Sequence, residues 1–585
     1  MATSKSSNIA ARLDRIDAQF DAKTGGYSFD IDFKRMVNGS LAKVNAQIYR
    51  ELAAMPPRDR EMLRLFEYFV AGEVLDYREG LYGTLIWGDG KADIMHIHYL
   101  FEGGSGEGVR DQKTAIDRVF AFYGISADNQ INTFIGFIDR FVQKYPDTQL
   151  SRRAIARLRG GSAWANVNDL TDDFDPGKPG LLLGIHEGSG TPVRFSGEGS
   201  LITIASPGTG KTQSQVLPNL LEWPGAAVVL DVKGEIFEAT ARWRAESGFP
   251  VYRFAPLDPD QSHAFNPLKT IRNTDDFLWE DSRFLASMLL VPNKKATDPF
   301  WETKAQDLIT ASVAAVCAIN PPETRSMGAV LDYLYRVEWE EFLAILKSSP
   351  IRAMMRTGHS IEGMTEKTLD SVLQTAQSAL SAWEGPRVER VITGNDWDVS
   401  DFQRHDHPPT LYITLRPGEI DPYRSLLRVI VAQHLRGLMQ EVPNGKAPPV
   451  LFMLDEVPRL GNMPPIEEAL EVGRQYGIKL WMFAQSLGQL RNIYPNADGM
   501  IGNCRVQCYM NPALHDGTAE HLAKSLGMFD SPLDGSRQRV VEPQALAGPE
   551  FRDLIVGFSQ SMRPFKMKKQ MAYEAEPYRS RMLGG

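Results

Sequence analysis

Cysteine is almost absent from this sequence, with 3 residues in 585. Three cysteines cannot all pair with one another, and so few are typical of a chain that folds in a reducing compartment. An excess of basic residues is missing too, because 64 Lys and Arg stand against 73 Asp and Glu, for a formal net charge of -9. A basic coat over the whole chain, of the kind that grips nucleic acid, is therefore excluded, and phosphate contacts would have to come from local patches.

Long apolar runs are also lacking. A membrane-spanning helix needs about 20 consecutive apolar residues. The nearest candidates are residues 63–75, which contain Arg64, Glu67 and Glu73, and residues 308–319, which are too few. The first residues of the sequence hold no long apolar stretch of the kind found in a secretory signal. We therefore expect no integral membrane segment.

What is present is ordinary globular composition, with 43% hydrophobic and 23% charged residues. The length corresponds to roughly four domains of about 150 residues. Residues 1–150 are predicted to form a mostly helical N-terminal domain of unknown role, with helical apolar spacing at 62–70 and 131–142. His96 and His98 alternate there on a short predicted strand, and we interpret them as a structural pair because no Cys or acidic partner has ligand spacing.

Beyond about residue 180, short apolar runs alternate with helical segments. These runs are continuous rather than alternating, which is typical of strands buried on both faces of a parallel sheet. The predicted strands are 201–204, 226–230, 251–254, 411–415, 450–454 and 478–483. Residues 275–400 interrupt the series with helical segments at 307–319, 338–346 and 365–383, so an all-α domain is predicted to be inserted between two strands of the sheet.

A phosphate-binding loop follows the first of these strands. Residues 205–212 read Ala-Ser-Pro-Gly-Thr-Gly-Lys-Thr, and a helix is predicted from about Gln213 to Trp223, which is the strand–loop–helix context that a P-loop requires. Backbone N–H groups and the helix N-terminus would surround the phosphates of ATP, Lys211 would reach the β- and γ-phosphates, and Thr212 would hold Mg²⁺. The alternative is a Gly-rich turn that binds nothing. The predicted nucleotide-binding residues are Ser206, Pro207, Gly208, Thr209, Gly210, Lys211, Thr212 and Gln213.

Two carboxylates follow the predicted strand 450–454. Asp455 is expected to join Thr212 as a ligand of Mg²⁺, and Glu456 to orient and deprotonate a water molecule. A solvent-facing pair at a strand end is the alternative. Asp231 ends another strand at the same edge of the sheet, and it would either contact the nucleotide or cap the next helix.

Two further polar residues flank the predicted strand 478–483. Gln485 follows it, and it could contact the γ-phosphate or the attacking water, or be an ordinary polar residue at a strand end. Arg474 precedes it, and it could be an arginine finger that acts on the nucleotide of a neighbouring subunit, or a surface cation. The predicted catalytic residues are thus Glu456, Arg474, Gln485 and Lys211.

These motifs together resemble the TraG-like type IV coupling proteins, the ATPases that feed DNA or protein into type IV secretion and conjugation systems. The resemblance covers about residues 160–575. The residues that carry it occur in the order of the family's motifs. They are the P-loop and residues 194–199, 216–225, 230–235, 266–268, 300–301, 454–461, 476–478 and 484–490.

The resemblance implies an α/β fold: a RecA-like P-loop nucleotide-binding domain in two parts (151–274 and 401–585), with the all-α domain (275–400) inserted between them. It implies an ATPase that uses ATP and Mg²⁺ and assembles as a homo-hexamer when active. Its implied partners are single- or double-stranded DNA, relaxosome or effector proteins, and components of the secretion channel. The resemblance implies that the protein is located in the cytoplasm of a bacterium or at the periphery of the inner membrane.

The sequence departs from the family at its start. Familiar members begin with membrane-spanning helices, whereas this sequence begins with about 150 residues that contain none. The leading hypothesis is an ATP-driven coupling protein or DNA translocase without transmembrane helices. A motor for protein effectors, and a nucleotide-gated recruitment module that does not translocate its substrate, remain as alternatives.

Overall fold

The computed structural model describes two compact units, each taken here by itself. One unit comprises residues 168–519 and 543–585, and the other comprises residues 1–167 and 520–542. The described residues are 178–187, 189–290, 299–404, 406–443, 448–530 and 537–584, with the short pieces 20–21, 26–27, 164–165 and 172–174.

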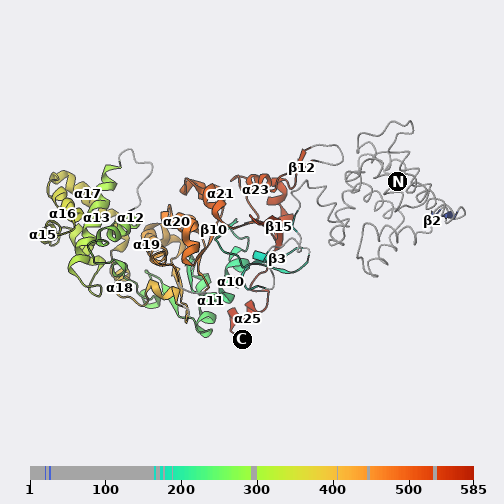
Figure 1. The fold of residues 1–585 in the computed structure, drawn as a ribbon, viewed down its shortest axis with the longest axis horizontal. Coiled ribbons are helices and arrows are strands. Elements are labelled where there is room, and N and C mark those ends of the chain that lie inside the picture. Colours follow the sequence, from blue (N-terminus) through green and yellow to red (C-terminus); the bar gives the residue numbers. More distant parts are fainter. Residues whose placement is uncertain are drawn as a thin grey trace, which may run out of the picture. The chain divides into compact units, whose positions relative to one another are not determined.

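The larger unit is built on one sheet of 11 strands (Figure 1). Seven neighbouring strands run parallel, in the order β11-β5-β10-β9-β6-β8-β7, and four antiparallel strands, β4-β3-β15-β14, extend the sheet beside β11. The strands are β3 (Leu181–His186), β4 (Pro192–Phe195), β5 (Leu201–Ala205), β6 (Ala227–Asp231), β7 (Val251–Phe254), β8 (Thr410–Thr414), β9 (Val450–Leu454), β10 (Ile478–Ala484), β11 (Val506–Met510), β14 (Leu554–Ser559) and β15 (Met562–Lys568).

The six predicted strands are confirmed to within one residue at each end. Every residue of β5, β6, β8, β9 and β10 is buried, which is what their continuous apolar sequence requires. The α/β fold class predicted from the sequence is therefore confirmed. The antiparallel strands were not predicted, and β15 shows why: it alternates buried and exposed residues and includes a proline and several cations.

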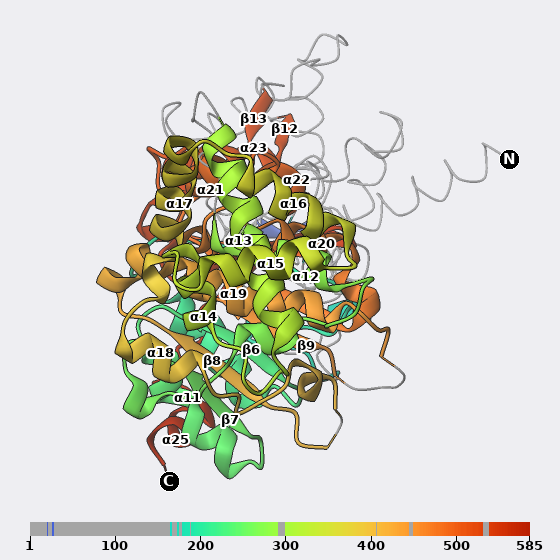
Figure 2. The same ribbon diagram turned by 90° about the vertical axis from the view of Figure 1, so that its left-hand side faces the viewer.

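Helices α12 to α18 lie between β7 and β8 in the chain, and Figure 1 shows most of them gathered beyond α19, away from the sheet. Figure 2 views this group from its own side. The three predicted helical segments in this region fall within or closely match α13, α15 and α17 with the 3-10 turn that follows it. The helices are α12 (Leu278–Leu289), α13 (Phe300–Ile319), α14 (Met327–Leu334), α15 (Trp339–Ser348), α16 (Arg352–Glu362), α17 (Glu366–Leu380) and α18 (Pro386–Ile392).

The remaining helices of the larger unit accompany the sheet or close the chain. They are α10 (Leu217–Glu222), α11 (Glu235–Glu246), α19 (Ile420–Leu438), α20 (Pro464–Val472), α21 (Leu487–Ile493), α22 (Ala497–Asn503), α24 (Pro543–Ala547) and α25 (Tyr578–Leu583). Helix α23 (Thr518–Leu526) begins in the larger unit and continues in the smaller one. The domain limits given above remain a prediction.

The smaller unit contributes few described residues. Strand β1 (Phe20–Asp21) pairs antiparallel with β2 (Gly26–Tyr27), and β12 (Met528–Asp530) pairs antiparallel with β13 (Arg537–Arg539). The predicted helical character of residues 1–150 and the pair His96 and His98 lie outside the described residues.

Two further findings concern membrane-spanning helices and the cysteines. Among the described residues, no helix combines the length and the apolar character that crossing a membrane demands. All three cysteines are buried and free, and burial raises the pKa of Cys317 and of Cys508 to about 12. The described ranges hold no group of three His, Cys, Asp or Glu placed to bind a metal.

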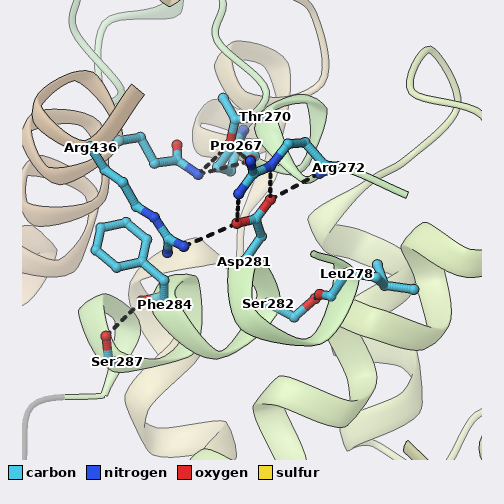
Figure 3. Close-up of polar contacts among 10 residues, drawn as sticks. Pro267, Thr270, Arg272, Leu278, Asp281, Ser282, Phe284, Ser287 and Arg436 are labelled. Atoms are coloured by element: carbon cyan, nitrogen blue, oxygen red, sulfur yellow. Dashed lines mark hydrogen bonds and ion pairs between the residues drawn. The ribbon is translucent and has the colours of Figure 1, made fainter. Parts of the chain in front are cut away.

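A buried carboxylate joins the first helix after β7 to the sheet's covering helix α19 (Figure 3). Asp281 of α12 accepts two hydrogen bonds of 2.8 Å from the Arg272 guanidinium and one of 3.1 Å from Arg436 of α19. The side chain of Asp281 is only 7% exposed, whereas the arginines are partly exposed. The Arg436 guanidinium also lies over the ring of Phe284, 4.2 Å from its centroid. This cluster fastens α12 to the core that carries the P-loop.

We predict that Asp281→Ala lowers the free energy of unfolding by about 3 kcal/mol, the low end for breaking a buried ion pair because both arginines can still reach water. Urea unfolding followed by tryptophan fluorescence measures the change. Asp260→Ala is the matched control, since its pair with Arg390 is 79% and 60% exposed and should contribute nothing measurable. Equal midpoints for Asp281→Ala and the wild type would show that the cluster does not fasten α12.

Candidate nucleotide-binding site

The P-loop leaves the end of β5 with two glycines in the left-handed region, Gly208 at φ 75° and Gly210 at φ 85°. An L side chain rarely adopts these angles, so glycine is needed at both positions for the loop to turn its N–H groups inward. The Thr209 hydroxyl donates to the carbonyl of Ser206 at 2.7 Å, and the Ser206 hydroxyl donates to the carbonyl of Asn511 at the end of β11. One hydrogen bond within the loop and one to the end of β11 thus fix the conformation of the P-loop.

The helix predicted from about Gln213 to Trp223 is not a single α-helix. Thr212–Val216 form a π-helical turn, and α10 begins only at Leu217. The N–H of Leu217 bonds the carbonyl of Thr212, five residues back, and Pro218 has no N–H to continue the α-helical pattern from the preceding turn. A helix therefore follows the P-loop as predicted, and its first turn is π-helical rather than α-helical.

Buried amides fix this helical segment against the sheet. The Gln215 side chain donates to the carbonyl of Leu183 and accepts from the Thr203 hydroxyl of β5. The Asn219 side chain both accepts from the N–H of Leu182 and donates to its carbonyl, as a strand neighbour would. The helical segment after the P-loop is consequently fixed to β3 and β5 by buried hydrogen bonds.

An ion pair connects the P-loop to the predicted acidic strand. Lys211 Nζ lies 2.9 Å from Asp455 Oδ1, and each side chain is 15% exposed. Burial raises the pKa of Asp455, while the positive charge of Lys211 lowers it in part. The Thr212 hydroxyl and the Asp455 carboxylate supply oxygen ligands of the kind that Mg²⁺ takes, and the Lys211 ammonium suits a phosphate.

Glu456 and Gln485 also come together. Glu456 is 8% exposed, and its Oε1 accepts a hydrogen bond of 2.5 Å from the Gln485 side chain at the end of β10. Its backbone has φ 142°, an angle that a non-glycine residue adopts only where the surroundings enforce it. The structure therefore brings together four of the predicted residues: Lys211, Asp455, Glu456 and Gln485.

Asp231 acts within its own chain segment. Its two carboxylate oxygens accept from the N–H groups of Gly234 and Phe237 at 2.9 and 2.8 Å, at the start of α11. Burial raises its pKa to about 6, against the lowering effect of these N–H groups. Of the two interpretations left open by the sequence, the helix cap is the one that these bonds support.

Arg474 lies away from the other predicted residues. It sits in the turn Gly473–Tyr476 that enters β10, whereas the P-loop leaves the far end of the parallel neighbour β5. Seven residues of strand, about 23 Å, separate those two edges of the sheet. Arg474 pairs with Glu198 at 2.5 Å, and both side chains are 70% exposed. Arg474 therefore cannot reach the P-loop of its own chain.

Residues 569–577 lie against the P-loop, and no sequence motif predicted this contact. The N–H of Ala572 donates to the carbonyl of Gln213 at 2.9 Å, and the methyl of Met571 lies against Gly210. The Gln213 side-chain oxygen is buried there without a hydrogen-bond partner. These residues are more than 350 positions apart, and no motif in residues 569–577 points to a nucleotide.

We predict that Asp231→Ala lowers the free energy of unfolding by about 1–2 kcal/mol, the usual effect of losing a cap, and leaves the Kd for nucleotide unchanged. Urea unfolding and calorimetric titration with a non-hydrolysable ATP analogue measure the two quantities. A weakened Kd without a loss of stability would instead make Asp231 a nucleotide contact.

Known proteins share much of this sequence. Residues 171–532 match the family described as type IV secretory system conjugative DNA transfer. The conjugal transfer protein TraG of Escherichia coli is 28% identical over 427 residues, which cover 63% of this chain and 64% of that protein. VirD4 of Agrobacterium fabrum is 28% identical over 336 residues, covering 56% of this chain and 49% of VirD4. The chain thus spans about half to two thirds of the length of these relatives.

Solved structures of the plasmid coupling protein TrwB share the fold. TrwB in complex with ADP and Mg²⁺ aligns with a TM-score of 0.53 at 18% identity, over 67% of this chain and 90% of TrwB. TrwB with the ATP analogue ADPNP aligns with a TM-score of 0.55 at 19% identity, over the same shares. The RecA-like fold expected from the resemblance is confirmed by these neighbours. Because the family match extends over well more than half of the sequence, the chain belongs to the type IV secretory system conjugative DNA transfer family.

Proposed function

We propose that this protein is an ATP-hydrolysing coupling protein, a DNA translocase that recruits DNA or nucleoprotein and drives it into a type IV secretion or conjugation system. The observation that carries the proposal is the meeting of Lys211, Asp455, Glu456 and Gln485 at the P-loop. TraG and VirD4 support the transfer role by their kinship, and the nucleotide complexes of TrwB support ATP and Mg²⁺ as the ligands.

In the proposed mechanism, the backbone N–H groups from Ser206 to Thr212 surround the phosphates. Thr212 and Asp455 would hold Mg²⁺, which supplies positive charge to the phosphate oxygens. Lys211, paired with Asp455 in this structure, would turn to the phosphates, so that one carboxylate becomes available to the metal. The pair therefore keeps a lysine and a carboxylate neutralised and in place before the nucleotide arrives.

Glu456 would accept the proton of the attacking water. Gln485 donates to one carboxylate oxygen, so it fixes the orientation of Glu456 and leaves the other oxygen to the water. Gln485 directly follows β10 and precedes Ser486, whose side chain caps α21, so Gln485 connects the site to a helix beyond it. Arg474, at the opposite edge of the sheet, would complete the site of a neighbouring copy in a homo-hexamer.

The proposed partners are DNA, relaxosome or effector proteins, and components of the secretion channel. The proposed location of the protein is the bacterial cytoplasm or the periphery of the inner membrane. Stimulation of ATP hydrolysis by single- or double-stranded DNA tests the substrate. Stimulation by effector protein alone would favour a protein motor. Turnover with no directional movement of DNA would favour a nucleotide-gated recruitment module.

The role of Glu456 gives the decisive variant. We predict that Glu456→Gln binds ATP with an unchanged Kd, because Lys211, Thr212 and Asp455 remain, and hydrolyses it at least a hundredfold more slowly, since the base is gone. Lys211→Ala is expected to lose ATP binding itself. Calorimetric titration and a phosphate-release assay separate the two effects. Hydrolysis by Glu456→Gln at the wild-type rate would refute its assignment as the base.

The position of Arg474 predicts a trans contribution. Arg474→Ala should bind ATP like the wild type and turn it over roughly a thousandfold more slowly, the lower end for arginine fingers. Wild-type activity per subunit should rise with protein concentration. Mixing Arg474→Ala with Lys211→Ala should restore some activity, because some interfaces then pair an intact P-loop with an intact arginine.

Arg390→Ala is the matched control, because this arginine also belongs to an exposed ion pair, with Asp260. It should change neither binding nor turnover. If mixing restores nothing and wild-type activity per subunit is independent of concentration, Arg474 is a surface cation.

A further inference from the structure

Residues 569–577, here called the strap, cross beside the P-loop between β15 and α25. The strap is held at both ends. The N–H of Lys569 bonds the carbonyl of Asp553, and Tyr578, the first residue of α25, donates its hydroxyl to Glu222 Oε1 at 2.9 Å. Its middle lies at the P-loop, where fully buried Ala572 bonds Gln213 and Met571 lies against Gly210.

The helix after the strap is fastened to the helices behind the P-loop, and Figure 1 shows α25 next to α10 and α11. Arg581 donates to the carbonyl of Leu221 at 3.1 Å, and Arg242 of α11 donates to the carbonyl of Arg581 at 3.0 Å. Glu222, which receives Tyr578, also pairs with Arg194 at 2.7 Å. The motif residues 194 and 222, which have no part in the proposed hydrolysis, thus hold the strap in place.

The strap reaches the P-loop from the side opposite to the catalytic residues. In the sheet, β10 and β9 lie on one side of β5 and bring Gln485, Asp455 and Glu456 to the γ-phosphate end. The strand β11 lies on the other side of β5, followed by β14 and then β15, from which the strap continues. Under the proposed function, the γ-phosphate lies toward Gln485 and Glu456, so the nucleoside of the same nucleotide would extend toward the strap.

The strap presents groups that suit a nucleobase. Tyr573 follows the buried Ala572 and leaves 51% of its surface exposed, beside the partly buried thioether of Met571. An aromatic ring accepts any base by stacking, and a thioether packs well against a flat ring.

We propose that the strap forms the nucleoside-binding side of the nucleotide site, with Tyr573 as the stacking platform for the base and Met571 as the apolar contact beside it. The inference rests on the proposed function, because it assigns a further part of the same site. It makes the affinity for a nucleotide depend on a segment far from the P-loop in sequence, whereas the affinity for the phosphates alone depends on the P-loop.

The test compares two ligands on the full chain in the presence of Mg²⁺: the non-hydrolysable analogue ADPNP, and inorganic tripolyphosphate, which lacks the nucleoside. Tyr573→Ala should raise the Kd for ADPNP about tenfold, within the range of one lost base–aromatic stack, and leave the Kd for tripolyphosphate unchanged. Tyr573→Phe, which keeps the ring, should bind ADPNP like the wild type. Tyr335→Ala is the matched control, because Tyr335 is 50% exposed and lies among the inserted helices.

Each other outcome overturns the inference. An unchanged Kd for ADPNP in Tyr573→Ala, or an equal weakening of both ligands, would show that the strap supports the P-loop without touching the nucleoside. Wild-type binding of tripolyphosphate as tight as that of ADPNP would show that no nucleoside platform exists, although the phosphate site stands. If the wild type binds neither ligand, the proposed function itself fails.

Discussion

The ion pair between Lys211 and Asp455 is the contact on which the whole site depends. It joins a loop at the end of β5 to a residue at the end of β9, and β10 lies between these two strands. The pair can form only if three parallel strands end at the same level, which their register provides. Burial disfavours the charge on Asp455, and Lys211 compensates in part, so neither residue is well placed in that environment without the other.

The long separation of the two partners in sequence has a structural cause. Helices α12 to α18 are inserted between β7 and β8, before the acidic strand β9 is added to the sheet. A buried arginine of α19 joins the inserted helices to the segment that follows β9. Arg428 bonds the carbonyl of Met288 in α12 and the carbonyls of Leu460 and Asn462, just after Glu456 in the chain. One guanidinium therefore connects the inserted helices with the segment that carries the proposed base.

The parts of the fold that could be predicted from the sequence are those with a local sequence pattern. Buried parallel strands are continuous apolar runs, and the P-loop and Asp455 with Glu456 are local motifs at strand ends, so both could be found without a structure. Strand β15 has only two buried residues, and the places of the hairpins β3–β4 and β14–β15 in the sheet depend on pairing with strands distant in the sequence. The π-helical turn at Thr212 depends on one proline and on support from β3. The contact of Ala572 with Gln213 had no signal at all, because it depends on where β15 is placed in the sheet.

The order of the strands also places different groups of residues on the two sides of the P-loop. The strands on one side of β5 carry the residues proposed to act on the γ-phosphate, and those on the other side lead to the strap. Arg474 belongs to neither group, since it lies at the opposite edge of the sheet, where it is exposed and paired with Glu198. A surface ion pair of this kind contributes little free energy, so Arg474 can leave Glu198 at small cost when a stronger anion approaches. Under the proposed function, any nucleotide phosphate that Arg474 meets is one bound by another copy of the chain, because its own P-loop lies at the far edge of the sheet. Assembly would then be a condition for hydrolysis rather than a consequence of it.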